Sequence, residues 1–285
     1  MFRPALFLGA VGLFAGVLMS GQARAADLVF KAPPPAAATP CAVDGLNGKI
    51  AAFGGTFADQ ALFGGQGSFS APIGCQFGLQ VDALASSYDD HFLGAVAAHF
   101  FARDPSRGLI GIYGSTSRWD KFDGVRANHI APEFELYFGR FTLQGIAGLE
   151  FGNTASGVVG GNLVTYDVKD RWFDQINLAY YPIDNLKAFV GHRYLGGRHA
   201  LALGAEYGIP MSQGAMAAVF AEGRAGESDF YGAWGGVRFY FGQKDKTLIR
   251  RHREDDPPDW NPNVGSVANP NSTTPIIVGC GRSCS

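Results

Sequence analysis

The sequence predicts an all-β fold, an antiparallel up-and-down transmembrane β-barrel of about 12 strands, with about 10 as the alternative. Three observations support this prediction. Residues 133–151 alternate apolar and polar side chains in two strands around a turn at Gly139-Arg140. The same alternation recurs, with short turns, as far as residue 241, and it follows an N-terminal export signal. One alternating hairpin also suits a water-soluble sheet, so the repetition behind an export signal decides the fold class.

The hairpin shows the pattern most clearly. In its second strand, Phe141, Leu143 and Leu149 fall on one face, whereas Gln144 and Glu150 fall on the other. Strict alternation indicates a strand that separates two different environments. Because a membrane barrel has lipid outside, we expect the Phe and Leu face to point outward.

The N-terminus has the features of a signal peptide. Arg3 precedes an apolar stretch at residues 6–19, and Ala23-Arg24-Ala25 fits the small-x-small cleavage rule. We therefore expect residues 1–25 to be removed. An uncleaved anchor is the alternative, but the stretch is short and interrupted by Gly. No other run of about 18 apolar residues occurs, so no helical membrane span is predicted.

Composition and charge narrow the function. Of the 285 residues, 47% are hydrophobic, and the 40 Gly and 23 Phe suit strands that crowd together beside interfacial aromatic rings. Without residues 1–25, Lys and Arg fall from 23 to 21 while Asp and Glu stay at 25, so the net charge becomes −4. A protein without a basic excess is a poor partner for nucleic acid. No cofactor motif is present, and no cofactor is expected.

Residues 26–46 are expected to form a disordered Pro/Ala-rich linker. Its opening, Ala26-Asp27-Leu28 followed by Lys31-Ala32-Pro33-Pro34-Pro35, resembles the mature N-terminus of small outer-membrane barrel proteins of rhizobia and related alphaproteobacteria. That family's first strand carries a Trp-Thr-Gly-Phe-Tyr run, whereas residues 48–55 here read GKIAAFGG. The chain also lacks a strand-terminal aromatic at its end. The resemblance implies an outer-membrane location and a barrel fold, and it implies no reaction.

The barrel is expected at residues 47–242. Its strands are predicted at residues 47–57, 66–73, 76–85, 91–101, 109–117, 133–138, 141–151, 166–181, 186–194, 200–209, 215–224 and 230–241. The segment at 66–73 is the weakest, but single-chain bacterial barrels have an even number of strands, so it is retained. Short periplasmic turns are then expected at 104–108, 139–140, 182–185 and 210–213. Longer outer loops are expected at 58–65, 120–128 and 153–165.

With the apolar faces outward, the inner face becomes polar. The charged residues predicted to line the lumen are Asp82, His99, Glu133, Glu135, Glu150, Lys187, Arg193, Glu206, Glu222, Arg224 and Arg238, together with Gln80, Gln144, Gln175 and Asn177. Two interpretations stay open. The charges fill a narrow lumen as a salt-bridge network, or they line a solute path. Strand number does not decide, because about eight strands give a filled interior and about sixteen an aqueous channel.

The four cysteines suggest disulfides, which export permits. Cys280 and Cys284 could close a small loop, and Cys41 with Cys75 is the remaining pair. Free thiols are an alternative. Zinc is disfavoured because no His flanks the Cys280 pair, and no metal site is predicted.

Residues 243–285 begin with a dense charged run and continue with a Pro, Asn, Ser and Thr stretch. This composition predicts a disordered periplasmic tail. A docking segment for peptidoglycan or a periplasmic protein is the alternative.

Nothing in the sequence indicates catalysis. His99, His129, His192 and His199 have no Ser at a recognisable spacing, and no Gly-x-Ser-x-Gly, HExxH or phosphate-binding loop occurs. We expect no enzyme activity, and we expect an outer-membrane barrel in contact with lipid and lipopolysaccharide. Its role would be structural or that of a narrow passive pore for small solutes. A barrel-borne enzyme and a soluble secreted β-protein are the alternatives.

Overall fold

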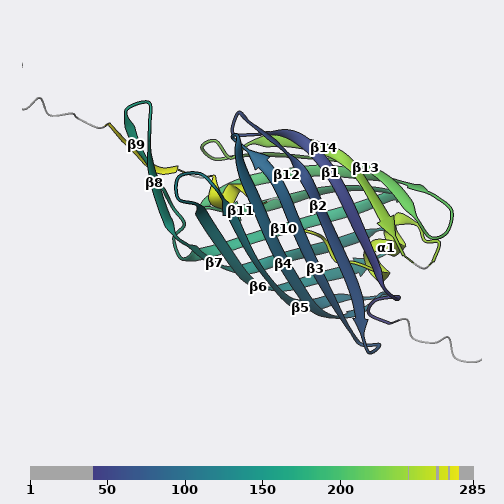
Figure 1. The fold of residues 1–285 in the computed structure, drawn as a ribbon. Coiled ribbons are helices and arrows are strands. Elements are labelled where there is room, and N and C mark those ends of the chain that lie inside the picture. The colour runs from purple at the N-terminus through teal and green to yellow at the C-terminus, as the bar shows by residue number, and fades with distance from the viewer. Residues whose placement is uncertain (1–40, 243, 261–262, 269, 276–285) are drawn as a thin grey trace, which may run out of the picture. The chain divides into compact units, whose positions relative to one another are not determined.

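The structure, a computed structural model, describes residues 41–242, 244–260, 263–268 and 270–275. Twelve of the described strands form one closed antiparallel barrel (Figure 1). The ring closes where the first strand pairs with the last, with Ala51 opposite Arg238. The predicted fold class and its strand number are confirmed. The predicted signal peptide at residues 1–25 and most of the predicted linker lie outside the described residues.

The barrel strands follow one another around the ring in chain order. They are β1 (Asn47–Phe57), β2 (Gln60–Ile73), β3 (Phe77–Tyr88), β4 (His91–Asp104), β5 (Gly108–Trp119), β6 (Val125–Phe138), β7 (Phe141–Gly152), β10 (Arg171–Ile183), β11 (Leu186–Leu195), β12 (Arg198–Pro210), β13 (Met216–Gly226) and β14 (Gly232–Phe241). We call the end where β1 begins and β14 ends the near end. The opposite end is the far end.

Side chains alternate between the two faces of the wall. In β3, Leu79 and Val81 are exposed on the outside, whereas Gln80 and Asp82 are buried inside. The outer wall carries exposed large apolar side chains on every barrel strand, among them Ile50, Phe69, Val81, Val96, Ile112, Leu136, Leu149, Leu178, Val190, Leu203, Val219 and Val237. Water would disfavour such a continuous apolar surface. This arrangement is the one that lipid favours.

Three predicted outer loops differ from the structure. Strand β2 begins at Gln60, so the first is a two-residue turn of Ala58 and Asp59, both with positive φ. Strand β6 begins at Val125, which shortens the second. The third, at residues 153–165, belongs to a hairpin outside the ring formed by β8 (Thr154–Val159) and β9 (Asn162–Asp167). In each case, residues that were predicted as loop are paired with a neighbouring strand. Cross-strand register decides this pairing, and the sequence pattern does not show it.

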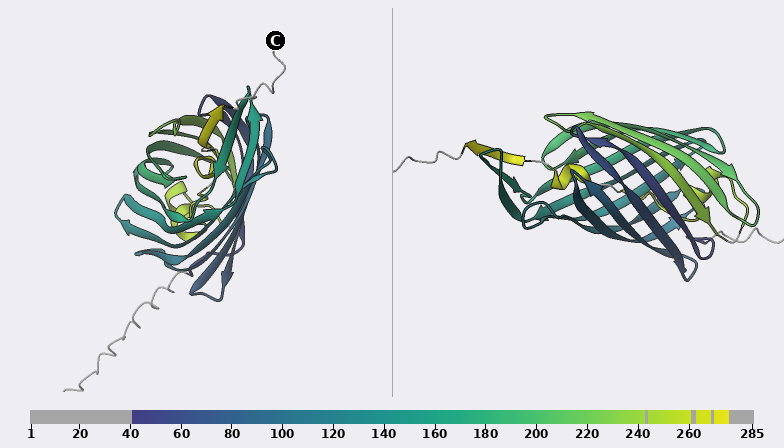
Figure 2. Two further views of the ribbon diagram at one scale, coloured as in Figure 1. Left: turned by 90° about the vertical axis from the view of Figure 1, so that its left-hand side faces the viewer. Right: turned by 45° about the horizontal axis from the view of Figure 1, so that its top comes forward.

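The prediction of a disordered C-terminal tail is wrong for residues 244–260 and 263–268. These residues include helices α1 (Leu248–Glu254) and α2 (Val264–Val267), and β15 (Pro270–Pro275) follows. An end view shows the chain inside the ring of strands (Figure 2). We call residues 244–275 the tail. Cys280 and Cys284 lie outside the described residues, so their predicted pairing is a prediction still.

The tail crosses the lumen from the near end to the far end. It starts beside the end of β14, and α1 lies at the near end. At the far end, Val264 and Val267 of α2 pack in one buried cluster with Trp119, Val125 and Phe230. Beyond it, β15 pairs with β9 as the third strand of the hairpin sheet. Burial of each valine contributes about 1.5–3 kcal/mol, so the cluster anchors the tail at the far end.

The segment before β1 is also ordered, so the predicted disordered linker is wrong for residues 41–46. Cys41 forms a disulfide with Cys75 in the β2–β3 turn, the pairing left open by the sequence. Ala42 and Val43 are buried, and Val43 packs against Phe101. This segment is therefore attached to the near end. Among the described residues, no helix is long and apolar enough to cross a membrane.

Candidate functional site

The lumen is the candidate site, and the structure places every charged residue predicted for it on the inner wall. These residues form three separate groups. Asp82, His99 and Glu133 make one. His129 and Glu150 belong to a second near the far end. The third group surrounds the tail and the central cavity, and it includes Lys187, Arg193, Glu206, Glu222, Arg224 and Arg238. Glu135 lies beside the cavity and accepts a hydrogen bond from the Tyr137 hydroxyl.

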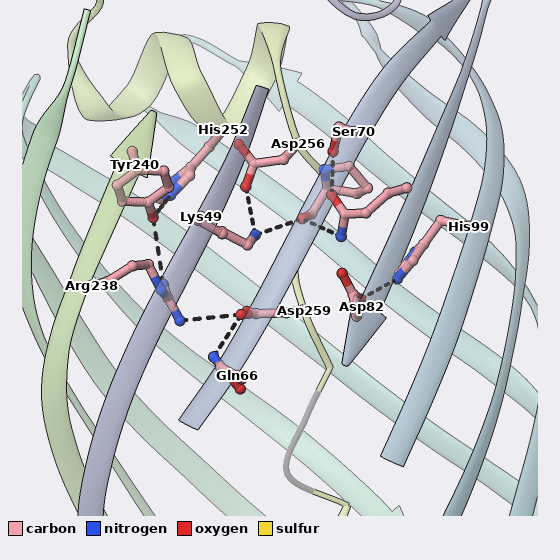
Figure 3. A network of polar contacts seen from close by, with 12 residues as sticks. Lys49, Gln66, Ser70, Asp82, His99, Arg238, Tyr240, His252, Asp256 and Asp259 are labelled. Carbon is pink, nitrogen blue, oxygen red and sulfur yellow. Dashed lines mark hydrogen bonds and ion pairs between the residues drawn. The ribbon is translucent and has the colours of Figure 1, made fainter. Parts of the chain in front are cut away.

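Lys49 binds the tail directly (Figure 3). Its ammonium lies 2.5 Å from the Asp256 carboxylate and donates a second hydrogen bond to the Pro257 carbonyl at 3.2 Å. Both side chains are almost completely buried, at 4% and 3% exposure. Removing one partner of a buried ion pair leaves an uncompensated charge, which typically costs about 3–5 kcal/mol. This pair therefore holds the tail against β1.

A second carboxylate of the tail binds the neighbouring wall. Asp259 accepts a hydrogen bond from Gln66 Nε2 at 2.7 Å, and Arg238 Nη2 lies 3.3 Å from the same oxygen (Figure 3). Arg238 also donates to Glu206 at 2.8 Å, and the Tyr240 hydroxyl donates to the other Glu206 oxygen at 2.5 Å. Arg238 thus connects a wall carboxylate to a tail carboxylate.

The wall also satisfies the tail's backbone. Gln80 Nε2 donates to the Pro257 carbonyl at 3.3 Å, and Gln175 Nε2 donates to the Trp260 carbonyl at 3.3 Å. Pro257 and Pro258 have no N–H group, so only their carbonyls need partners inside the barrel. A Pro-Pro segment is therefore well suited to pass through a polar lumen without a partner strand.

Helix α1 covers the near end. Leu248 packs on Met216, Ala218 and Tyr240, all buried. The Arg251 guanidinium donates to the Gly214 carbonyl at 2.7 Å, in the β12–β13 turn. Three further contacts reach other turns and strand ends: Leu248 N to Asn185 Oδ1, Ile249 N to the Asp184 carbonyl, and Arg253 Nη2 to the Phe141 carbonyl. The helix therefore joins the start of β7 to the β10–β11 and β12–β13 turns.

A charged cluster ties α1 to the segment before β1. The Lys246 ammonium lies 3.0 Å from Asp44, 3.3 Å from Glu254 and within hydrogen-bond distance of Asp255. Hydrogen bonding to Lys244 lowers the pKa of Asp44. Burial raises the pKa of Asp255 to about 6, although Lys246 opposes this shift. We therefore expect the near-end contacts of the tail to depend on pH.

In the far-end group, His129 has a serine partner, although no Ser lies at a recognisable spacing from it in the sequence. Cross-strand register places Ser115 opposite His129 and His129 opposite Glu150. Ser115 Oγ lies 3.2 Å from His129 Nδ1, and His129 Nε2 lies 3.1 Å from Glu150. This Ser–His–Glu row combines residues far apart in the sequence, so no spacing could reveal it.

The row nevertheless serves the tail. Ser266 of α2 lies 3.1 Å from His129 Nε2 and donates to Glu150 at 2.5 Å. Glu150 also accepts from the Gly196 N–H at 3.2 Å and lies 3.3 Å from Arg171 Nε. A hydrolase needs space beside its serine for a substrate carbonyl. None of the three row residues lines the central cavity. The geometry is that of an anchor for α2.

His99 joins the first group. Its Nε2 lies 2.9 Å from Asp82 and its Nδ1 lies 2.7 Å from Glu133, and all three side chains are buried. The ring also packs edge-on against Tyr113. The group links β3, β4 and β6 across the inner wall, and none of the described tail residues is hydrogen-bonded to it. It is a structural crosslink of the wall.

The central cavity is small and polar. Its volume is about 90 Å³, enough for a few water molecules. Its wall includes Lys187, Arg193 and Arg224, and the tail closes one side with Asp256 and Asp259. Within the described ranges, no cluster of His, Cys, Asp or Glu is arranged to hold a metal ion.

Sequence analysis missed the tail's partners. Lys49 alternates with the outward Ile50 in β1, so its inward position could have been inferred from the same pattern as the others. Asp256 and Asp259 could not, because no alternation marks a segment that runs through a lumen. The signal available was an inward Lys in β1 together with an acidic, Pro-containing segment after the barrel. The composition of that segment favoured disorder.

Comparisons with known proteins support the fold. No protein-family model and no curated protein matches the sequence. A structure from a study of the in-meso crystallization of membrane proteins is 13% identical, with a TM-score of 0.51 over 73% of this chain and 91% of that chain. The COG4313 outer membrane channel from Pseudomonas putida F1 is 8% identical, with a TM-score of 0.47 over 73% and 98%. The translocator domain of autotransporter NalP from Neisseria meningitidis is 13% identical, with a TM-score of 0.45 over 70% and 88%. At these identities, the likeness is one of β-barrel fold alone.

Proposed function

We propose that this chain is an outer-membrane β-barrel whose lumen is closed by its own C-terminal tail. The observation that carries the proposal is the combination of an apolar outer wall with a charged inner wall that binds residues 255–260. Lipid and lipopolysaccharide are the proposed partners of the outer wall. The near end would face the periplasm, because the chain is exported through it, and the far end would face outward.

The apolar wall argues for a membrane rather than secretion. Ile110 is 71% exposed, and exposed apolar side chains occur on all the barrel strands. The charged residues that face outward on the strands lie mostly near strand ends, such as Arg118 and Arg126. An exception is Asp174, the fourth residue of β10 counted from the far end, which lies 2.7 Å from His192. Polar side chains at that level suit the headgroup region of a bilayer.

The filled lumen argues for a structural role or a closed pore. The tail occupies the lumen along its axis and is bound at both ends and in the middle. A passive pore needs a continuous aqueous path, and the cavity of about 90 Å³ does not supply one. We propose no enzymatic role, because the Ser115 row is engaged with α2. No periplasmic docking role is proposed for residues 244–260, because their contacts are with the near end and the lumen of the barrel.

Two measurements test this proposal. The mature protein should require detergent for extraction and should migrate differently on electrophoresis before and after heating, as folded barrels do. In planar bilayers, the unaltered chain should be silent or nearly so. Extraction without detergent would reject the membrane assignment. Large, sustained conductance by the unaltered chain would reject the closed lumen while leaving the barrel intact.

A further inference from the structure

The charges around the central cavity are unevenly divided between the wall and the tail. The wall contributes five basic residues, Lys49, Lys187, Arg193, Arg224 and Arg238, and three acidic residues, Glu135, Glu206 and Glu222. The wall therefore has an excess of two positive charges. The tail contributes two carboxylates to the same cavity, those of Asp256 and Asp259. The tail thus neutralises a charge excess that belongs to the wall.

Both tail carboxylates are bound by wall side chains. Asp256 is held by Lys49, and Asp259 is held by Gln66 and Arg238. Between Asp255 and Trp260, the described tail residues belong to no helix or strand. Contacts of this kind are made one side chain at a time, so a soluble molecule with the same groups could replace them.

The cavity also offers donors that the tail leaves unused. Among the described residues, the donors Arg193 Nε, Arg238 Nε and Gln144 Nε2 are buried and have no hydrogen-bond partner, as is also true of the acceptor oxygens Gln66 Oε1, Glu135 Oε1 and Gln175 Oε1 of the same lining. The three donors include two guanidinium groups, which gives the cavity its positive character. Buried donors of this kind are costly unless an acceptor reaches them. Carboxylate oxygens are acceptors only, and guanidinium groups bind them strongly.

We propose that this basic part of the wall is a binding site for small dicarboxylates, and that the tail is its built-in competitor. Asp256 and Asp259 occupy the positions that the two carboxylates of a solute would take. When the solute displaces the tail, the lumen opens to anions in preference to cations, because the exposed wall carries the positive excess. This inference rests on the proposed membrane barrel and adds the class of solute that it would take.

The first test measures displacement of the tail. A Pro258→Cys variant, with Cys280→Ser and Cys284→Ser to remove other thiols, places a single reactive thiol beside the cavity. Succinate should increase its labelling by a membrane-impermeant maleimide several-fold, whereas acetate at the same ionic strength should not. A Ser106→Cys variant in the same background is the control, because Ser106 lies in an exposed turn and should react equally in every buffer. Equal rates with succinate and acetate at residue 258 would overturn the inference.

The second test measures ion preference. In planar bilayers with a KCl gradient, the full-length Asp256→Asn, Asp259→Asn double variant should open more often than the unaltered chain. Its reversal potential should have the sign of chloride permeation, and adding Arg238→Gln should move it toward zero. The matched control, Asp90→Asn with Asp170→Asn, neutralises two exposed loop carboxylates and should behave as the unaltered chain.

The outcomes separate the two proposals. A reversal potential with the sign of potassium permeation, or one that does not change when Arg238→Gln is added, would overturn the anion site. Neither result would contradict the barrel or the placement of its tail. Absence of openings in a double variant that still folds, shown by its heat-dependent migration, would also overturn it. Extraction of the protein without detergent would instead contradict the proposed function itself.

Discussion

The Lys49 ammonium lies 2.5 Å from the Asp256 carboxylate, across a separation of 207 residues in the sequence. One group belongs to the first strand of the ring and the other to the segment that fills it. The pair is buried, so removing one charge would leave the other without compensation in the lumen.

Removing one charge of this pair should loosen the tail more than removing both. Lys49→Met or Asp256→Leu alone should weaken binding of the tail to the wall by about 3–5 kcal/mol, because an unpaired charge stays buried. The double variant should recover most of that loss. Protease cleavage within α1, timed for all four proteins, provides the measurement. Additive losses in the double variant would show that the two groups do not interact as the structure places them.

Lipid contact by the outer wall is testable at Val81, near the middle of β3. It is 49% exposed, and Val158 of the hairpin outside the ring is 62% exposed. Val81→Arg should destabilise the barrel by about 2–4 kcal/mol in lipid vesicles, since an arginine near the bilayer centre must leave water. Val158→Arg is the matched control and should have little effect. Urea unfolding of both variants gives the comparison, and equal midpoints would contradict a lipid-facing β3.

The near-end cluster predicts a pH effect. Because burial raises the pKa of Asp255 to about 6, its charged form is disfavoured in the folded tail. Protonation therefore stabilises the bound tail as pH falls from about 7 to about 5. Hydrogen exchange of the α1 amides should slow over this range in the unaltered chain, relative to Asp255→Asn at each pH. Asp44, whose pKa is lowered, would begin to weaken the cluster only near and below its usual range. A pH response that survives in Asp255→Asn would assign the effect elsewhere.

Glu150 is predicted to be an anchor of the far end and not a member of a catalytic triad. It accepts hydrogen bonds from Gly196 and Ser266 and lies beside His129 and Arg171. Glu150→Gln should lower stability by at least about 1–3 kcal/mol, because it leaves buried polar groups without their acceptor. Ser115→Ala should change stability little. The unaltered protein and both variants should hydrolyse a chromogenic ester no faster than buffer alone. A serine-dependent rate would support the enzyme alternative.

The sequence predicted the wall well and the lumen's contents poorly, for a physical reason. Strand β3 alternates strictly, so the inward position of Asp82 follows from the period of two. The partners of Asp82 do not follow, because His99 and Glu133 reach it through register with other strands. The loop predicted at 58–65 is wrong because most of it belongs to β2, where Gly64 pairs with Phe53 and Gly65 with Ala52 of β1. Residues 255–260 have no periodicity at all, and their order comes from wall contacts.

Strand β15 pairs with β9 beyond the far end, while the residues that precede the tail remain hydrogen-bonded in β14. A closed ring has no side opening, so a chain with portions on both sides reaches this state by one of two routes. Its C-terminal portion travels end-first through a finished ring, or the β1–β14 seam zips shut around a portion already laid inside. In either case, biogenesis of this molecule has a mandatory sequence of events, and a bulky fusion at the C-terminus should obstruct the first route and spare the second.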